Sequence, residues 1–225
     1  MADANPATTN RAAIVTRDPQ RTRERILAAA LKEFSGKGFT GARVDAIARR
    51  AAINKRMLYH YFRDKEGLFR EVLRRKIAQR VAWRHAAPME LEDWLPYWFG
   101  MTCRDLEWSR LLQWEALQGV GGRIIDEDRR RRSVAEAVEQ FRRRQKLGLL
   151  PGNLNVRHVL LAMVALTMFP MAFPQLTSLV TGCSVFEERF QKEHTEFLRK
   201  LARRLRPRER GRNSRWPTVA QVTRK

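Results

Sequence analysis

Four side chains that can donate hydrogen bonds recur at helical spacing in the first third of the chain. They are Lys55, Arg56, Tyr59 and His60. In a helix over residues 55–62 they would share one face, opposite Leu58 and Phe62, which can be buried. Lys and Arg can donate to guanine O6 and N7 in a DNA major groove, while Tyr and His can reach phosphates. The pattern indicates nucleic-acid recognition; the alternative is a solvated charged face on an ordinary helical hairpin.

A neighbouring helix and a tight turn are expected to position this face. Upstream, apolar side chains recur at i, i+3, i+4 and i+7, which predicts a helix with one buried stripe. That stripe consists of Val44, Ile47, Ala48 and Ala51. Ala52 and Ile53 would form the turn, and Asn54 is a good N-cap for the helix over residues 55–62. Residues 43–62 therefore have the pattern of a helix-turn-helix motif.

Flanking helices complete a small core around this motif. An apolar stripe predicts a helix over residues 20–35, ended by Gly36 and Gly38. Asp64 is the expected N-cap of a helix over about residues 65–83, whose free N–H groups and Lys65 could hold a DNA phosphate. The expected core of the three short helices is Leu27, Leu31, Phe34, Val44, Ile47, Leu58 and Phe62.

The segment INKRMLYHYFRDKEGLF resembles the V-x-x-x-x-LYxYF-x-x-KExL signature of the TetR family of bacterial repressors. The resemblance extends upstream through RERILAAALKEFSGKGF and covers about residues 21–81. Two positions depart from the family pattern. Ala42 and Arg43 stand where Ser or Thr usually begins the first motif helix, so Thr40 is considered as a substitute N-cap. Ala52 stands where the turn usually has Gly, and we expect no positive φ to be needed there.

The resemblance implies an all-α protein that binds a palindromic operator in double-stranded DNA as a homodimer and is released by a small apolar effector of unknown identity. The residues expected to contact DNA are Arg43, Asn54, Lys55, Arg56, Met57, Tyr59, His60 and Lys65. The expected organisation is a flexible arm (residues 1–18), a helix-turn-helix DNA-binding domain (19–84), a larger helical ligand-binding and dimerisation domain (85–206) and a basic disordered tail (207–225).

The larger domain has helical periodicity and many aromatic residues. A stretch over residues 156–173 is apolar nearly all round, which predicts a helix buried on every side. Residues 156–169 of this stretch and the last helix, residues 185–205, form the expected subunit interface, in which Phe190 and Leu201 would take part. An effector cavity is expected at Trp94, Trp98, Met101, Trp114 and Met163. The alternative is that these side chains are plain core.

Composition narrows the possible functions. A net charge of +21, from 45 basic and 24 acidic residues, favours a polyanionic partner, because Lys and Arg release counterions on meeting phosphates. The excess in residues 1–84 and 207–225 keeps a sequence-indifferent architectural DNA-binding protein as the alternative. The two cysteines and four histidines form no metal-ligand or catalytic pattern, so no enzyme activity, metal or cofactor is expected. No targeting segment or membrane span is predicted, and the cysteine usage fits the cytoplasm.

Overall fold

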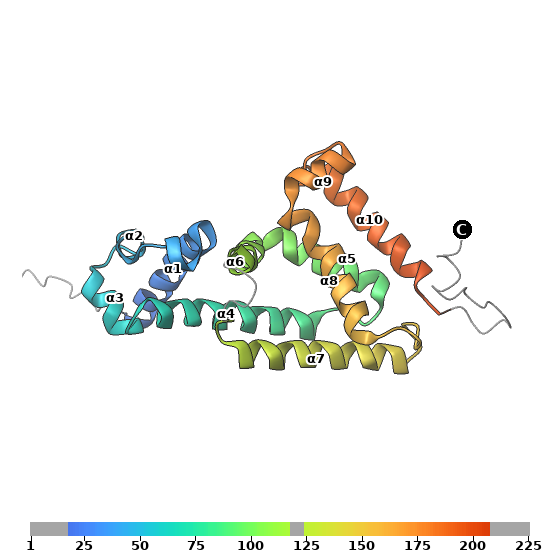
Figure 1. Ribbon diagram of the computed structural model, residues 1–225, viewed down its shortest axis with the longest axis horizontal. Helices are drawn as coiled ribbons and strands as arrows, with labels where there is room; N and C mark the ends of the chain where they lie inside the picture. The colour runs from blue at the N-terminus through green and yellow to red at the C-terminus, as the bar shows by residue number, and fades with distance from the viewer. Residues whose placement is uncertain (1–17, 118–123, 208–225) are drawn as a thin grey trace, which may run out of the picture. The chain divides into compact units, whose positions relative to one another are not determined.

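The computed structural model describes residues 18–117 and 124–207. These ranges contain ten α-helices and no strand, so the all-α expectation is confirmed (Figure 1). The chain divides into two compact units, Met1–Arg74 and Arg75–Lys225, with the division inside one long helix. The expected arm and tail fall outside the described residues, apart from Asp18 and Pro207.

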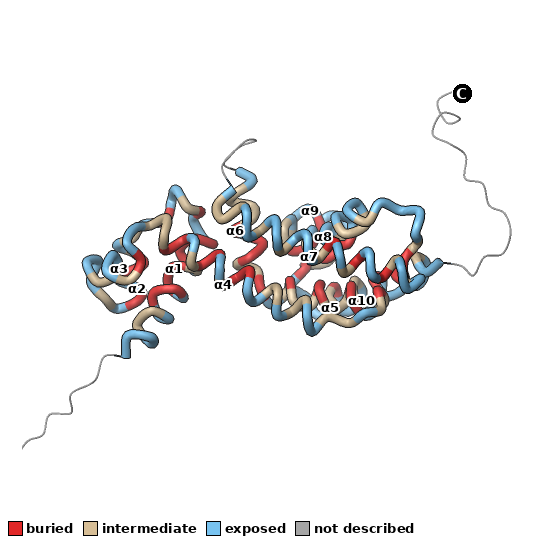
Figure 2. The backbone as a smooth tube through the Cα atoms, turned by 90° about the horizontal axis from the view of Figure 1, so that it is seen from below, coloured by how far each residue is buried: buried red, intermediate tan, exposed pale blue. Residues whose placement is uncertain are grey.

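The first unit is built from three helices and the start of a fourth: α1 (Pro19–Gly41), α2 (Val44–Arg50), α3 (Lys55–Phe62) and α4 (Lys65–Ala86). Five of the seven expected core residues are buried, as Figure 2 reflects along α1, whereas Leu31 and Val44 are half-buried. Phe69 of α4 closes this core, with its ring centroid 4.8 Å from that of Phe34. Helix α3 has the bounds that the sequence predicts, because Asn54 caps it locally.

Two local predictions in the first unit are wrong. Helix α1 does not end at Ser35 but runs to Gly41, because Gly36 stays helical and the backbone breaks only at Gly38, where φ is 70°. Ala52 adopts a φ of 51°, in the left-handed region that favours glycine. The Arg25 guanidinium offsets the strain of this turn, because it donates to the carbonyl oxygens of Ala51 and Ala52.

Glu71 of α4 ties that helix to α1. Its carboxylate accepts from Arg74 at 2.5 and 2.7 Å and pairs with Arg23 at 2.6 Å. The hydrogen bond from Arg74 is the main cause that lowers the pKa of Glu71 to about 2, and the Arg23 guanidinium adds to it against the opposing effect of burial. A carboxyl with a lowered pKa stabilises the folded state above its ordinary pKa of 4.5 and loses that effect as it becomes protonated.

We therefore expect the free energy of unfolding to fall as pH is lowered from about 4.5 towards 2. In Glu71→Gln this part of the pH dependence should be smaller, because the amide does not titrate. Urea unfolding of both proteins at pH 7, 4.5 and 3 would check this. The prediction is wrong if the difference in stability between the two proteins is as large at pH 3 as at pH 7.

The second unit has its own core. It contains the rest of α4 together with α5 (Leu91–Arg104), α6 (Leu106–Leu117), α7 (Glu127–Lys146), α8 (Val156–Ala172), α9 (Pro174–Thr181) and α10 (Glu188–Arg204). Helix α5 packs against α8 and α10, and α8 also packs against α6 and α7. Buried positions follow α5 and α10 in Figure 2. Phe99, Phe141 and Leu198 are among the most buried side chains of this core.

The prediction that residues 156–173 form a helix buried on every side is wrong for the single chain. Leu161 and Phe169 of α8 are 64% and 44% exposed, although Met163 is buried. Phe190, expected at a subunit interface, is 3% exposed, and its ring packs against Phe99 of the same chain.

No single described helix is long and apolar enough to cross a bilayer. Helices α8 and α9 meet those criteria only together, and their axes bend by 93°.

Candidate nucleic-acid interface and ligand cavity

Helix α3 presents the donor-rich face that the sequence predicts. Asn54 Oδ1 accepts the Met57 N–H at 2.7 Å, so this side chain caps the helix. Leu58 and Phe62 are buried, and Met57 is half-buried. The side chains on the opposite face, Lys55, Arg56, Tyr59 and His60, are all exposed.

The charges on this face are not equally available. Lys55 Nζ lies 3.0 Å from the carboxylate of Asp45, and the hydrogen bond with Asp45 raises the pKa of Lys55. Arg56, by contrast, makes no ion pair within residues 18–117 and 124–207. A guanidinium without a competing carboxylate can make a bidentate contact with a base edge or a phosphate. Arg56 is therefore the basic side chain of α3 whose charge is most available to a ligand.

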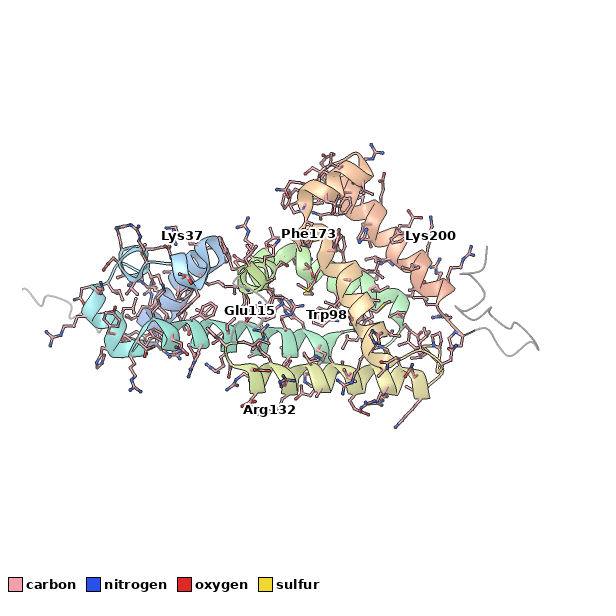
Figure 3. The ribbon with its side chains drawn as sticks, in the orientation of Figure 1. Lys37, Trp98, Glu115, Arg132, Phe173 and Lys200 are labelled. Atoms are coloured by element: carbon pink, nitrogen blue, oxygen red, sulfur yellow. The ribbon has the colours of Figure 1, made fainter. Side chains whose placement is uncertain are left out.

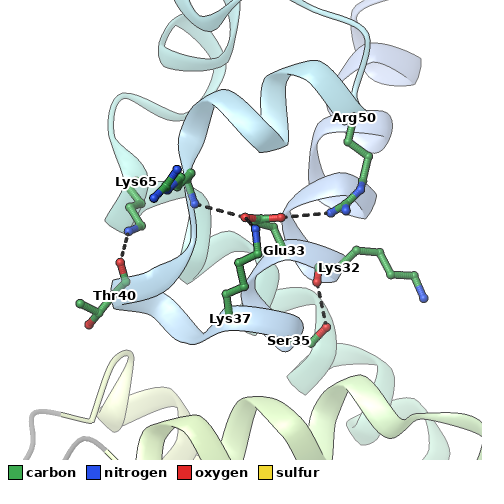
Figure 4. Close-up of polar contacts among 8 residues, drawn as sticks. Lys32, Glu33, Ser35, Lys37, Thr40, Arg50 and Lys65 are labelled. Carbon is green, nitrogen blue, oxygen red and sulfur yellow. Dashed lines mark hydrogen bonds and ion pairs between the residues drawn. The ribbon is translucent and has the colours of Figure 1, made fainter.

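The N-terminus of α2 is held by a residue that the sequence did not single out. The buried carboxylate of Glu33 accepts from the Arg43 N–H at 3.4 Å, Lys37 at 2.8 Å and Arg50 at 3.3 Å (Figure 4). Arg43 itself makes no side-chain cap, so Glu33 rather than Thr40 supplies the acceptor at this helix end. A carboxylate there is favourable, because the helix N-terminus carries partial positive charge.

The side chain of Arg43 is exposed before α2, whereas Lys65 and Asp64 at the start of α4 are held by local contacts. Lys65 Nζ donates to the Thr40 carbonyl oxygen at 3.2 Å and lies 4.9 Å from the centroid of the Phe39 ring. Burial lowers the pKa of Lys65. Asp64 Oδ1 accepts the Gly67 N–H at 2.6 Å, which makes it the N-cap of α4. A side chain at Gly67 would place its Cβ 2.5 Å from the Phe62 carbonyl oxygen, so only glycine fits here.

A cavity of about 290 Å³ lies inside the second unit. Trp94, Trp98 and Trp108 contribute aromatic surface, and the aliphatic side chains of Leu160 and Val164 come from α8. Figure 3 shows Trp98 among the helices of this unit and Arg132 on the outer side of α7. Of the five residues expected at an effector site, Trp94 and Trp98 line the cavity. Met101, Trp114 and Met163 are not among its lining residues; Met163 belongs to the core.

Sequence reasoning missed three arginines that line this cavity, Arg80 and Arg84 of α4 and Arg130 of α7. One signal was available for the first two: with Ile77 they lie at i, i+3 and i+7, on the apolar stripe of α4. Arg130 stands in a run of four basic residues, Arg129–Arg132, whose other members are exposed. Only its position in the folded unit separates it from its exposed neighbours.

Comparison with known proteins relates both units to one group of regulators. The family model described as "Bacterial regulatory proteins, tetR family" matches residues 26–72, and the model "Tetracyclin repressor-like, C-terminal domain" matches residues 90–204. The HTH-type transcriptional repressor SCO4008 of Streptomyces coelicolor is 30% identical over 169 residues, which are 75% of this chain and 88% of that protein.

Two further proteins resemble parts or most of the chain. The HTH-type transcriptional repressor NicS of Pseudomonas putida is 46% identical over 65 residues, which are 29% of this chain and 31% of that protein. The crystal structure of SCO4942 from Streptomyces coelicolor superposes with a TM-score of 0.69 at 25% identity, over 83% of this chain and 99% of that one. The similarity thus extends through both units.

Proposed function

The chain belongs to the TetR family of DNA-binding transcriptional regulators, and on that premise we propose that it is a cytoplasmic repressor that binds a palindromic operator as a homodimer. In this proposal α3 enters the major groove, and a small molecule with an apolar body releases the DNA by filling the cavity of the second unit. The observation that carries the proposal is the face of α3, where four exposed donors lie opposite two buried apolar side chains.

Arg56 and Lys65 should have separable roles in DNA binding. Arg56→Ala should weaken operator binding by about 1–3 kcal/mol and relax the preference at one base pair, because Arg56 has the free guanidinium of α3. Lys65→Ala should weaken operator and random duplex alike and lower the salt slope by about 1, as expected for a phosphate contact. Fluorescence anisotropy on both duplexes at several salt concentrations measures these effects.

The contact of Lys65 with the Thr40 carbonyl oxygen calls for a control. Thermal unfolding of Lys65→Ala shows whether the loss of DNA binding follows from loss of fold. If both variants change operator and random-duplex binding by the same factor, the division into a base-reading and a phosphate-binding residue is wrong.

The apolar surface of the second unit supports a homodimer. Along α8 the exposed apolar side chains of Leu161, Ala162, Ala165 and Phe169 form one helical stripe, with His158 at its N-terminal end. Phe197 of α10 is 50% exposed. Exposed apolar side chains gathered on one helix face are typical of a subunit interface. In such a dimer the two α3 helices should be separated by ~34 Å, one turn of B-DNA, so that they reach successive major grooves.

Release of DNA requires that the effector bind the arrangement incompatible with DNA more tightly than the compatible one. The operator must then weaken the effector by the same factor by which the effector weakens the operator. Trp98 is a poor residue for testing this coupling by truncation, because it also belongs to the core of the second unit. A measurement of effector affinity with and without operator tests it directly.

A sequence-indifferent architectural protein remains the second candidate, because the chain carries a net charge of +21. Specific sites are typically ~10³–10⁷ times tighter than non-specific DNA. The test is selection of bound fragments from the DNA that flanks the gene of this protein, followed by salt titration on the selected and a shuffled duplex. Equal affinities for the two duplexes would refute the repressor proposal and favour the architectural one.

A further inference from the structure

The three arginines that line the cavity differ in whether a carboxylate pairs with the guanidinium. Arg84 donates to Glu136 at 3.0 Å and to the Ser133 hydroxyl at 2.7 Å. Arg130 makes two hydrogen bonds, at 2.5 and 2.8 Å, to the carboxylate of Glu115. Each of these guanidiniums therefore has a carboxylate of its own. Neither needs a ligand to balance its charge.

Arg80 has no such partner in the part of the chain that the structure describes. Its guanidinium carbon lies 5.0 Å from the centroid of the Trp98 ring and 5.3 Å from that of Trp108, so it is held over aromatic faces. The nearby carboxylate of Asp105 accepts a hydrogen bond from Lys76. Burial lowers the pKa of Arg80 to about 10, although Asp105 opposes this, so the group stays charged at neutral pH.

Hydrogen-bond donors without acceptors accompany this charge. The Nε1 atoms of Trp94 and Trp98, two residues that line the cavity, are buried and have no acceptor among the described residues. The cavity lining includes no Asp or Glu side chain of the described ranges. The half-buried guanidinium of Arg80 thus lines a cavity whose described lining supplies no carboxylate, and a partly buried charge without a partner is costly. Asp105, whose Oδ2 atom has no hydrogen-bond partner, acts on Arg80 through its charge and not through an ion pair.

We propose that the cavity binds an organic monoanion, a flat apolar body that carries one carboxylate, with the carboxylate on Arg80. This inference rests on the proposed function, because it defines the chemical class of the effector. The carboxylate would complete a bidentate pair with the guanidinium. The ring system would lie against the indole rings, where offset or edge-on contacts are favourable. The cavity of about 290 Å³ is at the small end of the range for ligand sites, which suits a compact ligand of one or two rings.

The test compares 2-naphthoate with 2-naphthamide, which has nearly the same shape and no charge, by isothermal titration calorimetry on the full-length protein at pH 7.5. We expect 2-naphthoate to bind about ten- to hundred-fold more tightly, because a hydrogen bond to a charged group replaces a neutral one. In Arg80→Gln the two probes should bind with similar affinity. Arg132→Gln removes a charge from the exposed side of α7 and should leave the preference unchanged.

Three outcomes would overturn the proposal: equal affinity of the two probes for the wild-type protein, no binding of either probe, or an unchanged preference in folded Arg80→Gln. The comparison of the two probes on the wild-type protein needs no variant, so it decides the matter even if Arg80→Gln does not fold. Operator binding without any probe is measured in parallel. A protein that binds its operator but shows no preference for the anion refutes only the ligand class.

Discussion

Leu161→Asp should convert the protein into a monomer and lower its operator affinity by about 10²- to 10⁴-fold, since a monomer loses the gain from binding two half-sites at once. Leu161 is 64% exposed in the single chain, at the centre of the apolar stripe of α8. A carboxylate at this position is hydrated in the monomer but would be buried without a partner in the dimer, and burial of an unpaired charge is expensive. The substitution therefore opposes association while leaving the fold of the chain intact.

Leu147→Asp provides the matched control. Leu147 is 56% exposed at the C-terminal end of α7 and does not belong to the stripe. Sedimentation velocity gives the oligomeric state of both variants, and anisotropy with the operator gives their affinities. A dimeric Leu161→Asp protein would place the subunit interface elsewhere, and a monomeric one with full operator affinity would contradict the need for two half-sites.

Phe190→Asp, at a position that the sequence analysis assigns to the subunit interface, should behave differently. Its ring is buried against Phe99, so the variant should unfold the second unit before it affects a dimer. Near-ultraviolet circular dichroism of the two variants would separate these effects.

Glu33→Ala should lower the free energy of unfolding by about 2–3 kcal/mol, because the carboxylate caps α2 and receives two charged donors. The side chain of Glu33 is 2% exposed, whereas Lys37 and Arg50 are about half exposed and can be rehydrated. The loss should therefore stay below that of a fully buried ion pair. Glu33→Gln should cost less than Glu33→Ala, since the amide oxygen can still accept the Arg43 N–H.

The pH dependence of this contribution has a definite sign. Burial alone would raise the pKa of Glu33, but hydrogen bonds from Lys37 and the Arg43 N–H, with the charges of Lys37 and Arg50, lower it. The stabilisation is present above the ordinary pKa of 4.5 and is lost as pH falls through the lowered value. Glu66→Ala, which breaks an exposed pair with Arg70, is the control and should cost under ~1 kcal/mol. Equal losses in urea unfolding for Glu33→Ala and Glu66→Ala would refute the capping role.

The helix-turn-helix could be predicted from the amino-acid sequence because its determinants are local. Asn54 caps α3 through a residue three positions away, and Leu58 and Phe62 mark the buried face by their spacing alone. Because Leu58 and Phe62 occupy the buried face, Lys55 and Arg56 must lie on the exposed one. The turn was predicted in the right place, but the positive φ of Ala52 was not, since that backbone conformation is held by Arg25 from another helix.

Contacts between residues far apart in the chain account for what could not be predicted. The sequence does not distinguish Glu33 from the other charged residues of α1. Its role depends on the fold, which places the Arg43 N–H and the Arg50 guanidinium within hydrogen-bond distance of its carboxylate. Arg80, Arg84 and Arg130 are the same residue type. Only the folded unit decides that Arg84 pairs with Glu136 and Arg130 with Glu115, while no carboxylate of the described residues pairs with Arg80. Likewise, the sequence of α8 is apolar on all sides. The side that becomes buried is the one against which α5, α6 and α7 pack. Periodicity specifies that a helix has an apolar face, whereas the partner of that face, and of each charge, is a property of the packed chain.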